Sequence, residues 1–217
     1  MKKLFYLLVV FIVLGLSQSC KKESTSEDTS LGGAQSPMGV VGTTISSAGY
    51  AISGISGLSG SVVSLKGGIS SYACSGTITN SAIKNLLSNN SAFTISGDNV
   101  SASGFKFKQT LEGIESYIGS GEGTIVKYAS NVGDTYSVGS TGRTRTVVSK
   151  STTDDYNYSG LLIKVMKIEE PTPGLKSIGI SKITYWANHK FGLVGVQYDL
   201  TDGTSLYLPI YSSTTNS

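Results

Sequence analysis

The sequence predicts a mainly β domain, built as an antiparallel β-sandwich or a partly closed barrel with one short helix. From about residue 90 to 211, short runs rich in β-branched and aromatic residues alternate with Gly, Asn, Asp and Pro. Glycine accounts for 27 of the 217 residues, and aromatic residues account for 9%, more than a disordered chain carries. No helical pattern of about 10–15 residues separates the runs, which disfavours a parallel α/β sheet.

The expected strands follow directly from these runs. They lie at residues 92–96, 103–109, 123–129, 134–138, 143–150, 161–169, 177–186, 191–200 and 204–211. Before them, Asn80 or Ser81 would cap a short helix that continues to Leu87.

The segment 37–78 is expected to be a Gly/Ser-rich arm in front of the sheet, and two conformations stay open for it. Three copies of an apolar-Ser-Gly unit begin at Ile52, Ile55 and Leu58. A period of three suits neither a strand nor a helix well. A helix that tolerates glycine would place these apolar residues on one face, at a cost of about 1 kcal/mol per glycine. The alternative is an irregular arm.

The C-terminal hairpin has a readable register. A three-residue loop at 201–203 pairs Val196 with Leu208 and gives one apolar face. A two-residue turn would mix the apolar residues over both faces of the sheet. We therefore expect Gly203 in the left-handed conformation, and Val194 and Val196 on the core side.

The opposite face of this sheet carries large aromatic residues. With a tight turn at Asn188, Trp186 and Phe191 would lie on that face together with Leu193. Large exposed apolar patches are rare on monomers, so a second layer is expected to cover them. We expect the arm at 45–64 to do so through Ile52, Ile55 and Leu58, with a ligand surface as the alternative. The candidate binding surface consists of Trp186, Phe191, Tyr156 and Tyr158.

The N-terminus has the pattern of a secretory signal peptide. Residues 1–3 include two lysines, and residues 4–16 are almost entirely apolar. Thirteen apolar residues would span about 20 Å as a helix, which is shorter than a hydrocarbon core of about 30 Å. We therefore expect residues 1–19 to be a cleaved signal rather than a membrane-spanning helix.

Residues 17–20 resemble the lipobox of bacterial lipoproteins, in the looser form of the Bacteroidota, with Ser17 in place of the usual Leu. The resemblance implies that Cys20 carries lipid on its sulfur, so that palmitate would label it, and anchors the protein in the cell outer membrane. The alternative is an ordinary cleaved signal followed by an unrelated cysteine. With Cys20 lipidated, Cys74 has no intrachain partner and is expected to be a small buried residue.

Residues 20–36 are expected to form a flexible tether between the lipid and a single domain at 37–217. Leu31 is the one aliphatic side chain larger than Ala among residues 21–36, which is too little apolar area to offset the chain entropy. Glu23, Glu27 and Asp28 resemble the export signals that send some Bacteroidota lipoproteins to the cell surface.

The charge balance excludes one class of partner. Without residues 1–19, 15 basic residues face 14 acidic ones, which gives a net charge of about +1. No Lys/Arg-rich run forms a basic patch in the remaining chain. We therefore expect no nucleic acid partner.

Four segments look like parts of uncharacterised Bacteroidota lipoproteins. They begin at Val132, Ser151, Ile168 and Asn188, and they read Val-Gly-Asp-Thr-Tyr, Ser-Thr-Thr-Asp-Asp-Tyr-Asn-Tyr, Ile-Glu-Glu and Asn-His-Lys-Phe-Gly-Leu-Val-Gly-Val. The likeness covers about residues 90–211. It implies a β-rich envelope domain and brings no catalytic residue or substrate with it.

No catalytic constellation can be assembled from the sequence. It contains no Gly-x-Ser-x-Gly elbow, no His-Glu-x-x-His pair and no phosphate-binding Gly-x-x-x-x-Gly-Lys loop. His189, the one histidine, falls in an expected turn. Glu169 and Glu170 are adjacent in a strand and would point to opposite faces, so both cannot serve one site. We expect no catalytic residue and no cofactor.

One oxygen-rich loop offers a calcium candidate. Asp154, Asp155 and Asn157 could supply ligands, because Ca²⁺ takes about six to eight oxygen ligands. The loop lacks the alternating spacing of acidic residues that calcium loops have. A loop held by hydrogen bonds from its own side chains is therefore expected instead of a metal site.

The sequence thus predicts a lipid-anchored envelope protein that acts as a non-catalytic binding or structural module, with a glycan or a protein as its partner. Tyrosine and tryptophan side chains suit both kinds of partner because they are flat and amphipathic. The alternative is a lipid-anchored carbohydrate-active hydrolase, in which a strand-end glutamate would pair with Asp134 or Asp155.

Overall fold

The computed structural model describes residues 31–47, 55–79, 93–117, 121–172, 180–201, 203 and 205–214. The predicted signal peptide, Cys20 and the helix expected at 81–87 lie outside the described residues. None of the described helical segments is both long enough and apolar enough to cross a membrane.

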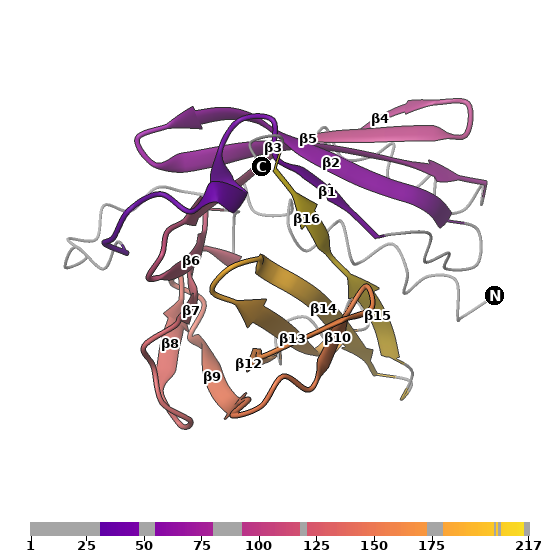
Figure 1. The fold of residues 1–217 in the computed structure, drawn as a ribbon. Coiled ribbons are helices and arrows are strands. Elements are labelled where there is room, and N and C mark those ends of the chain that lie inside the picture. Colours follow the sequence, from indigo (N-terminus) through magenta and orange to yellow (C-terminus); the bar gives the residue numbers. More distant parts are fainter. Residues whose placement is uncertain are drawn as a thin grey trace.

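Two antiparallel sheets make up most of the described chain, as Figure 1 shows. The upper sheet of that view has the order β16-β1-β2-β3-β5-β6-β7, with β4 paired to β5, and the lower sheet has the order β15-β14-β13-β12-β9-β8. The upper strands are β1 (Thr44–Ser46), β2 (Ile55–Lys66), β3 (Ile69–Ile78), β4 (Phe93–Ser96), β5 (Asn99–Gln109), β6 (Gly113–Ser116), β7 (Gly123–Lys127) and β16 (Tyr211–Ser213). The lower strands are β8 (Thr135–Val138), β9 (Arg143–Lys150), β12 (Met166–Pro171), β13 (Ile180–Asn188), β14 (Gly192–Leu200) and β15 (Ser205–Pro209).

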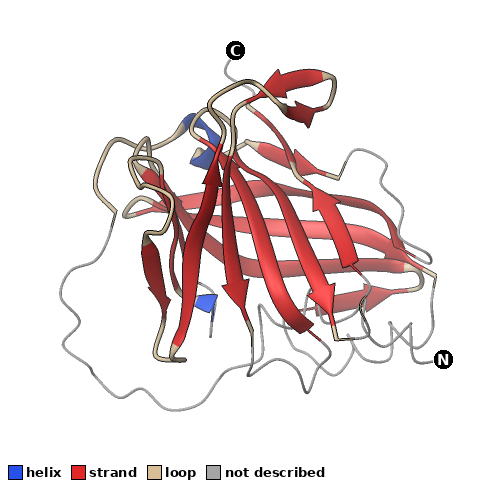
Figure 2. Ribbon diagram, turned by 90° about the horizontal axis from the view of Figure 1, so that it is seen from below, coloured by secondary structure: helices blue, strands red, loops and turns tan. Residues whose placement is uncertain are grey.

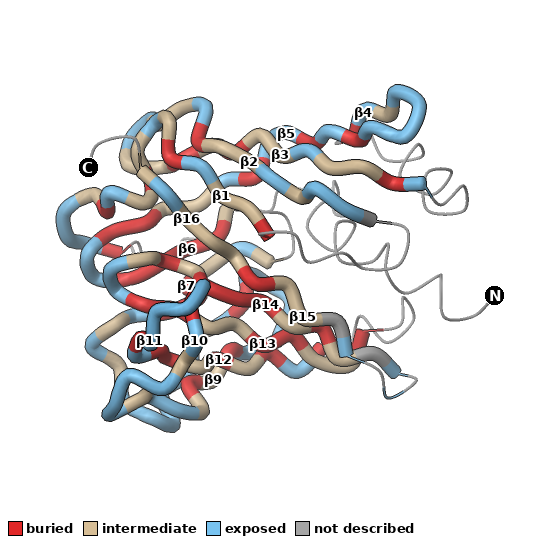
Figure 3. The backbone as a smooth tube through the Cα atoms, turned by 45° about the vertical axis from the view of Figure 1, so that its right-hand side comes forward, coloured by how far each residue is buried: buried red, intermediate tan, exposed pale blue. Residues whose placement is uncertain are grey.

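Two small elements lie outside these sheets. A hairpin consists of β10 (Tyr156–Tyr158) and β11 (Leu161–Ile163), and a single 3-10 turn, η2, spans Pro37–Gly39. Figure 3 shows the hairpin at the periphery of the molecule, with most of its residues exposed.

The sheets face each other and are joined along both sides. On one side the chain leaves the lower sheet at β15 and enters the upper sheet at β16, with Ile210 between the two strands. On the other side the Gly139 amide of the β8–β9 connection donates to the Glu122 carbonyl beside β7 at 2.8 Å. Figure 2 shows the strands of the two sheets crossing at a steep angle, an arrangement whose corners are made by strands that switch sheets.

The predicted fold class is therefore confirmed: the domain is mainly β, antiparallel, and consistent with a sandwich or a partly closed barrel. Its interior is packed at one end by side chains from both sheets. The buried cluster there consists of Ile114, Ile125, Val126, Val147, Met166, Ile168 and Ala187.

The expected Gly/Ser-rich arm is a pair of strands over most of its length. Residues 55–66 and 69–78 form β2 and β3, so neither a helix nor an irregular arm describes them. Two residues of β2 lie between Ser56 and Ser59, whereas one residue of β3 lies between their partners Thr77 and Ser75, and Gly57 has a φ of 62°. This bulge places one extra residue in β2, and the alternation of side chains restarts beyond it. A spacing of three residues between apolar positions is therefore compatible with a strand at this point.

The end of the expected tether is packed against the domain. Leu31 is buried, and its amide donates to the Glu115 carboxylate at 2.8 Å. The amide of Ser36 donates to the Gln109 carbonyl at 2.9 Å. Residues 31–36 are therefore not a free linker, because one aliphatic side chain and a few backbone hydrogen bonds are enough to attach a short segment to an existing sheet.

The predicted register of the C-terminal hairpin is confirmed. Val196 pairs with Leu208 and Tyr198 pairs with Leu206, and Gly203 has a φ of 85°. The assignment of faces is wrong at one end of β14. Trp186 pairs with Gly195 but Ala187 pairs with Leu193, so Val194 is the extra residue of a bulge. A bulge inverts the alternation beyond it, which turns Val194 outward and Leu193 inward.

Hairpin β10–β11, rather than the arm, covers the Trp186 face in the described chain. Trp186 packs against a cluster of buried side chains made by Tyr158, Ile163, Val165 and Val194. The expectation of a covering arm is wrong for Leu58, which lines the space between the sheets. Ile52 lies outside the described residues, and the side chain of Ile55 is also outside them.

Replacing Tyr158 with alanine should lower the free energy of unfolding by about 3 kcal/mol. The ring of Tyr158 stacks on Phe191 at a centroid distance of 4.6 Å, and its hydroxyl accepts a hydrogen bond from the Ser212 amide of β16 at 2.8 Å. Urea denaturation measures the change. Leu161→Ala in the same hairpin is the control, because Leu161 is 53% exposed and should change stability by no more than about 0.5 kcal/mol. Equal effects would show that the hairpin does not cover the sheet.

Candidate functional site

A cavity of about 230 Å³ lies between the two sheets. Most of its wall is apolar, with aromatic side chains from the upper sheet and aliphatic ones from the lower sheet. Representative wall residues are Phe105, Phe107, Ile125, Ile183, Val196 and Leu208. An apolar cavity of about 150 Å³ already holds a ligand of the size of benzene, so this space is large enough for a small organic molecule.

Cys74 contributes to the same wall from β3. Burial raises the pKa of its thiol to about 11, so the side chain is a neutral thiol at physiological pH. No described cysteine lies in position to bond with it. Cys74 was expected to be buried in apolar surroundings. Its surroundings are apolar, but the residue is only half-buried.

Three charged side chains line the cavity where β9 and β12 lie side by side. Arg143 Nη1 lies 2.8 Å from Glu170 Oε1, and Arg145 Nε lies 2.8 Å from Glu170 Oε2. All three side chains are no more than 6% exposed. We call Arg143, Arg145 and Glu170 the charged triad.

The guanidinium of Arg145 also binds the backbone of the neighbouring sheet. Its Nη1 donates to the carbonyls of Gly123 and Thr124 at 3.2 and 2.9 Å, and its Nη2 donates to the carbonyl of Gly121 at 2.7 Å. With the bond to Glu170, four donors of one side chain are engaged. Arg145 therefore ties β9 of the lower sheet to the start of β7 in the upper sheet.

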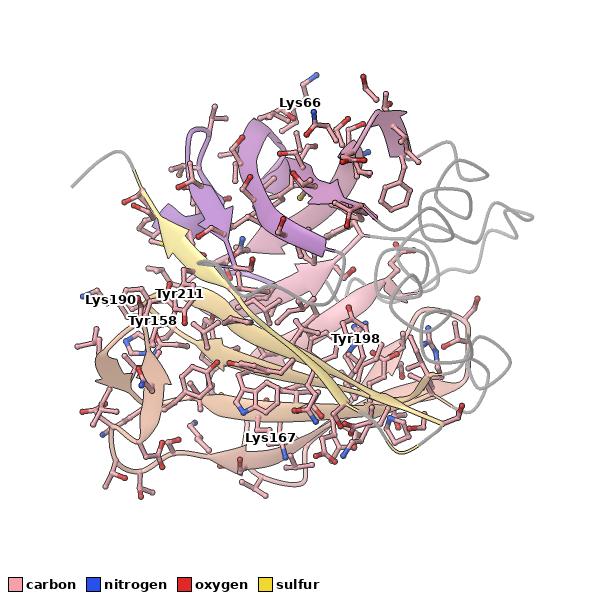
Figure 4. All side chains as sticks on the ribbon, turned by 90° about the vertical axis from the view of Figure 1, so that its right-hand side faces the viewer. Lys66, Tyr158, Lys167, Lys190, Tyr198 and Tyr211 are labelled. Atoms are coloured by element: carbon pink, nitrogen blue, oxygen red, sulfur yellow. The ribbon has the colours of Figure 1, made fainter. Side chains whose placement is uncertain are left out.

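Two tyrosines stand beside the triad. The hydroxyl of Tyr185 donates to Glu170 Oε2 at 3.0 Å, and the Tyr185 ring lies 5.6 Å from the guanidinium carbon of Arg145. Burial, aided by the nearby Glu170 carboxylate, raises the pKa of Tyr198 far above its ordinary value. Burial likewise raises the pKa of Tyr185, so both hydroxyls stay neutral and can donate hydrogen bonds. Figure 4 shows Tyr198 on the side of β14 that faces the upper sheet.

A second polar group lies in the cavity wall away from the triad. Gln109 donates through its side-chain amide to the hydroxyl of Tyr72, which in turn donates to the Met38 carbonyl at 3.3 Å. Gln35 donates to the Gln109 carbonyl at 2.9 Å. The residues around η2 are thereby bonded to β3 and β5, and these polar atoms are satisfied within the protein.

The structure brings together the four residues of the predicted binding surface, but it packs them against one another. Tyr156, Trp186 and Phe191 surround the buried Tyr158 on the outer face of the lower sheet. The Tyr156 hydroxyl contacts the hydroxyl of Tyr207 and donates to the Val194 carbonyl at 3.1 Å. Figure 4 labels Tyr158 and Tyr211 in this group, and their ring centroids lie 5.2 Å apart. Much of this aromatic area is thus used in internal packing.

The candidate calcium residues make separate turn contacts. Asp155 accepts a hydrogen bond from Ser151 Oγ at 2.8 Å, and Asn157 Oδ1 accepts one from the Gly160 amide at 2.8 Å. Asp154 is exposed in the same loop. Over the described ranges, no three His, Cys, Asp or Glu side chains are grouped as a metal site would require.

The adjacent glutamates point to opposite faces, as their alternation in a strand requires. Glu170 faces the cavity, whereas Glu169 lies 3.0 Å from Lys167 and 3.3 Å from Lys182 on the outer face. Partial burial alone would raise the pKa of Glu169, but hydrogen bonds from the two lysines outweigh it and lower the pKa. The stability from these pairs is thus present above the ordinary glutamate pKa of about 4.3 and is lost as the pH falls further.

The sequence interpretation missed the two arginines, although the sequence holds a signal for them. They are the only two arginines of the chain, against 15 lysines, and they stand two residues apart in one strand. Val147, two residues further along the same strand, is 0% exposed. Since residues i, i+2 and i+4 of a strand share a face, the pattern Arg-Thr-Arg-Thr-Val places both guanidinium groups on the core side.

No protein-family model, no curated protein and no solved structure matches this chain.

Replacing Glu170 with glutamine should lower the free energy of unfolding by about 3 kcal/mol or more, because two buried guanidinium groups lose their carboxylate. Chemical denaturation at pH 7 measures the effect. Glu169→Gln is the matched control, one residue away on the outer face, where its partly exposed ion pairs should contribute no more than about 1 kcal/mol. If both variants lower the free energy of unfolding by the same amount of about 1 kcal/mol or less, Glu170 is not buried between two guanidinium groups.

Proposed function

We propose that this protein is a lipid-anchored, non-catalytic binding module of the cell envelope that holds a small apolar ligand in the cavity between its sheets. The observation that carries the proposal is the cavity itself, about 230 Å³ in volume and walled by apolar side chains from both sheets. The space is partly open to solvent, so its apolar walls are exposed to water unless an occupant covers them, and large exposed apolar surfaces are rare on monomers. A cavity of this size is more readily explained by an occupant than by stability.

The composition of the wall favours binding over hydrolysis. Among the described residues that line the cavity, Glu170 is the single carboxylate, and it is bonded by Arg145 and Tyr185. A glycosidase-type reaction uses two carboxyl groups about 5–10 Å apart, one of which must take or give a proton. A single carboxylate in the described wall does not make up such a pair, which supports the non-catalytic module over the alternative of a hydrolase.

The anchor in the outer membrane rests on the signal pattern that ends at Cys20. A lipid on that cysteine would hold the domain near a membrane, where apolar molecules are concentrated. The proposed ligand and the proposed location are therefore compatible.

Metabolic labelling with palmitate tests the anchor. The protein should incorporate the label, and Cys20→Ser should incorporate none. Cys74→Ser is the control for the only other cysteine and should be labelled as the wild type is. Label that persists in Cys20→Ser would refute lipidation at this residue.

Fluorescence titration with 1-aminoanthracene, a small neutral apolar probe, tests the cavity. We expect saturable binding at one site per protein. Val196→Phe should weaken it at least tenfold, since Val196 is buried in the cavity wall and a phenyl ring would occupy the space. Val63→Phe makes the same change on β2 at a side chain that is 53% exposed, and it should leave binding unchanged. Absent or unsaturable binding in the wild type would overturn the proposed function.

A further inference from the structure

The hydroxyl group of Tyr198 differs from the other tyrosine hydroxyls of the cavity. Tyr198 lines the cavity and is 6% exposed. Across the described ranges, no side chain or backbone group forms a hydrogen bond with its hydroxyl. The other two tyrosines described in the wall are bonded, Tyr72 to the Met38 carbonyl and Tyr185 to Glu170. Buried polar groups are nearly always paired, so the unpaired phenol of Tyr198 needs an explanation.

The position of Tyr198 directs its ring into the space between the sheets. On β14 it pairs with Ile183 of β13, and Ile183 pairs with Glu170 of β12. Ile183 and Glu170 line the same cavity, and directly paired residues share a face of the sheet. Tyr198 therefore belongs to the row of lower-sheet residues that face the upper sheet, as Figure 4 shows. Its hydroxyl lies where a molecule in the cavity can reach it.

Tyr198 is a hydrogen-bond donor at physiological pH. Burial raises the pKa of its hydroxyl far above the ordinary value, and the Glu170 carboxylate raises it further, so the phenol keeps its proton. A molecule that fills the cavity displaces water from this hydroxyl. If that molecule offers no acceptor, the O–H is left buried and unpaired, which costs more free energy than a typical hydrogen bond contributes. The cavity thus discriminates against molecules that are wholly apolar.

The charged groups of the wall indicate that the acceptor is uncharged. Glu170 is paired with Arg143 and Arg145, at 2.8 Å in each case. Arg143 also donates to the hydroxyl of Thr141, and Arg145 also donates to three backbone carbonyls. These charges are engaged within the protein. A carboxylate that leaves water for an apolar cavity needs several donors to offset its lost hydration, whereas a carbonyl oxygen is satisfied by about one.

We infer that the cavity selects uncharged molecules that carry an acceptor oxygen on a small apolar body, as ketones and esters do, and that the Tyr198 hydroxyl donates a hydrogen bond to this oxygen. The inference rests on the proposed function and specifies the class of its ligand. The cavity volume limits the apolar body. A cavity of about 150 Å³ holds benzene, so about 230 Å³ accommodates a ring with a short substituent.

Displacement of 1-aminoanthracene by acetophenone and by isopropylbenzene tests the inference at pH 7.5. The two ligands share a phenyl ring, and a methyl group of the second replaces the carbonyl oxygen of the first. Tyr198→Phe removes the hydroxyl and keeps the ring. It should weaken acetophenone binding about fivefold to tenfold, as expected for one hydrogen bond, and leave isopropylbenzene bound as tightly or more tightly.

The outcomes separate this inference from the proposed function. Equal changes for both ligands, or no change for either, would overturn the inference and leave the proposed function standing. Failure of the probe and of both ligands to bind the wild type would overturn the proposed function itself. Tyr207→Phe is the matched control, because it removes a hydroxyl that contacts Tyr156 on the outer face of the lower sheet. It should keep both wild-type affinities, and a loss of acetophenone binding as large as in Tyr198→Phe would overturn the assignment to Tyr198.

The stability of Tyr198→Phe without ligand is a second test. Because the hydroxyl has no partner in the described chain, its removal should leave the urea midpoint unchanged or raise it. Tyr185→Phe removes a hydroxyl that donates to Glu170 at 3.0 Å and should lower the midpoint. A midpoint of Tyr198→Phe as low as that of Tyr185→Phe would show that the Tyr198 hydroxyl is bonded within the protein, and would overturn the inference.

Benzoate separates an uncharged acceptor from an anion, because it carries a carboxylate on the same phenyl ring. Acetophenone should bind the wild type at least tenfold more tightly than benzoate at pH 7.5, since the carboxylate loses more hydration on entering the cavity. Equal or tighter binding of benzoate would overturn the assignment of an uncharged ligand.

Discussion

The ion pairs of Glu170 with Arg143 and Arg145 are the interaction on which the rest of the molecule depends. Glu170 lies on β12 and the arginines lie on β9, so the pairs join two strands of the lower sheet. Arg145 extends the connection to the carbonyls of Gly123 and Thr124 in the upper sheet. One buried carboxylate thereby fixes the side on which the two sheets meet, and leaves an apolar space beside itself.

That arrangement is less stable than a fully packed interior would be. Closing the space with larger side chains would add contacts, and removing the charges would avoid their desolvation. The barrel is instead closed at its margins. The chain passes from β15 in the lower sheet to β16 in the upper sheet, and hairpin β10–β11 packs on the outer face through Tyr158. Packing at the margins allows the middle to stay open without loss of the fold.

Features that depend on the alternation of apolar and polar residues along a strand, and on turn residues, were predicted correctly from the sequence. The predictions were wrong where one extra residue in a strand breaks that alternation. The pairing of Val196 with Leu208 followed from keeping apolar residues on one face. A bulge at Gly57 interrupts the alternation of side chains in β2, so the sequence of this strand suggested an arm. A second bulge, at Val194, reverses the alternation in β14 and places Val194 on the outer face. The charged triad was missed because arginine is normally exposed, and burial depends on partners that are distant in sequence.

Nuclear magnetic resonance of the arginine side chains tests the central claim most directly, because the chain has only two arginines. In protein labelled with ¹⁵N, two Nε–H resonances are expected at pH 7. The resonance of Arg145, whose Nε–H is bonded to buried Glu170, should exchange with water far more slowly than that of free arginine. Exchange of both resonances at the rate of free arginine would show that the guanidinium groups are solvated, and would contradict a charged triad buried between the sheets.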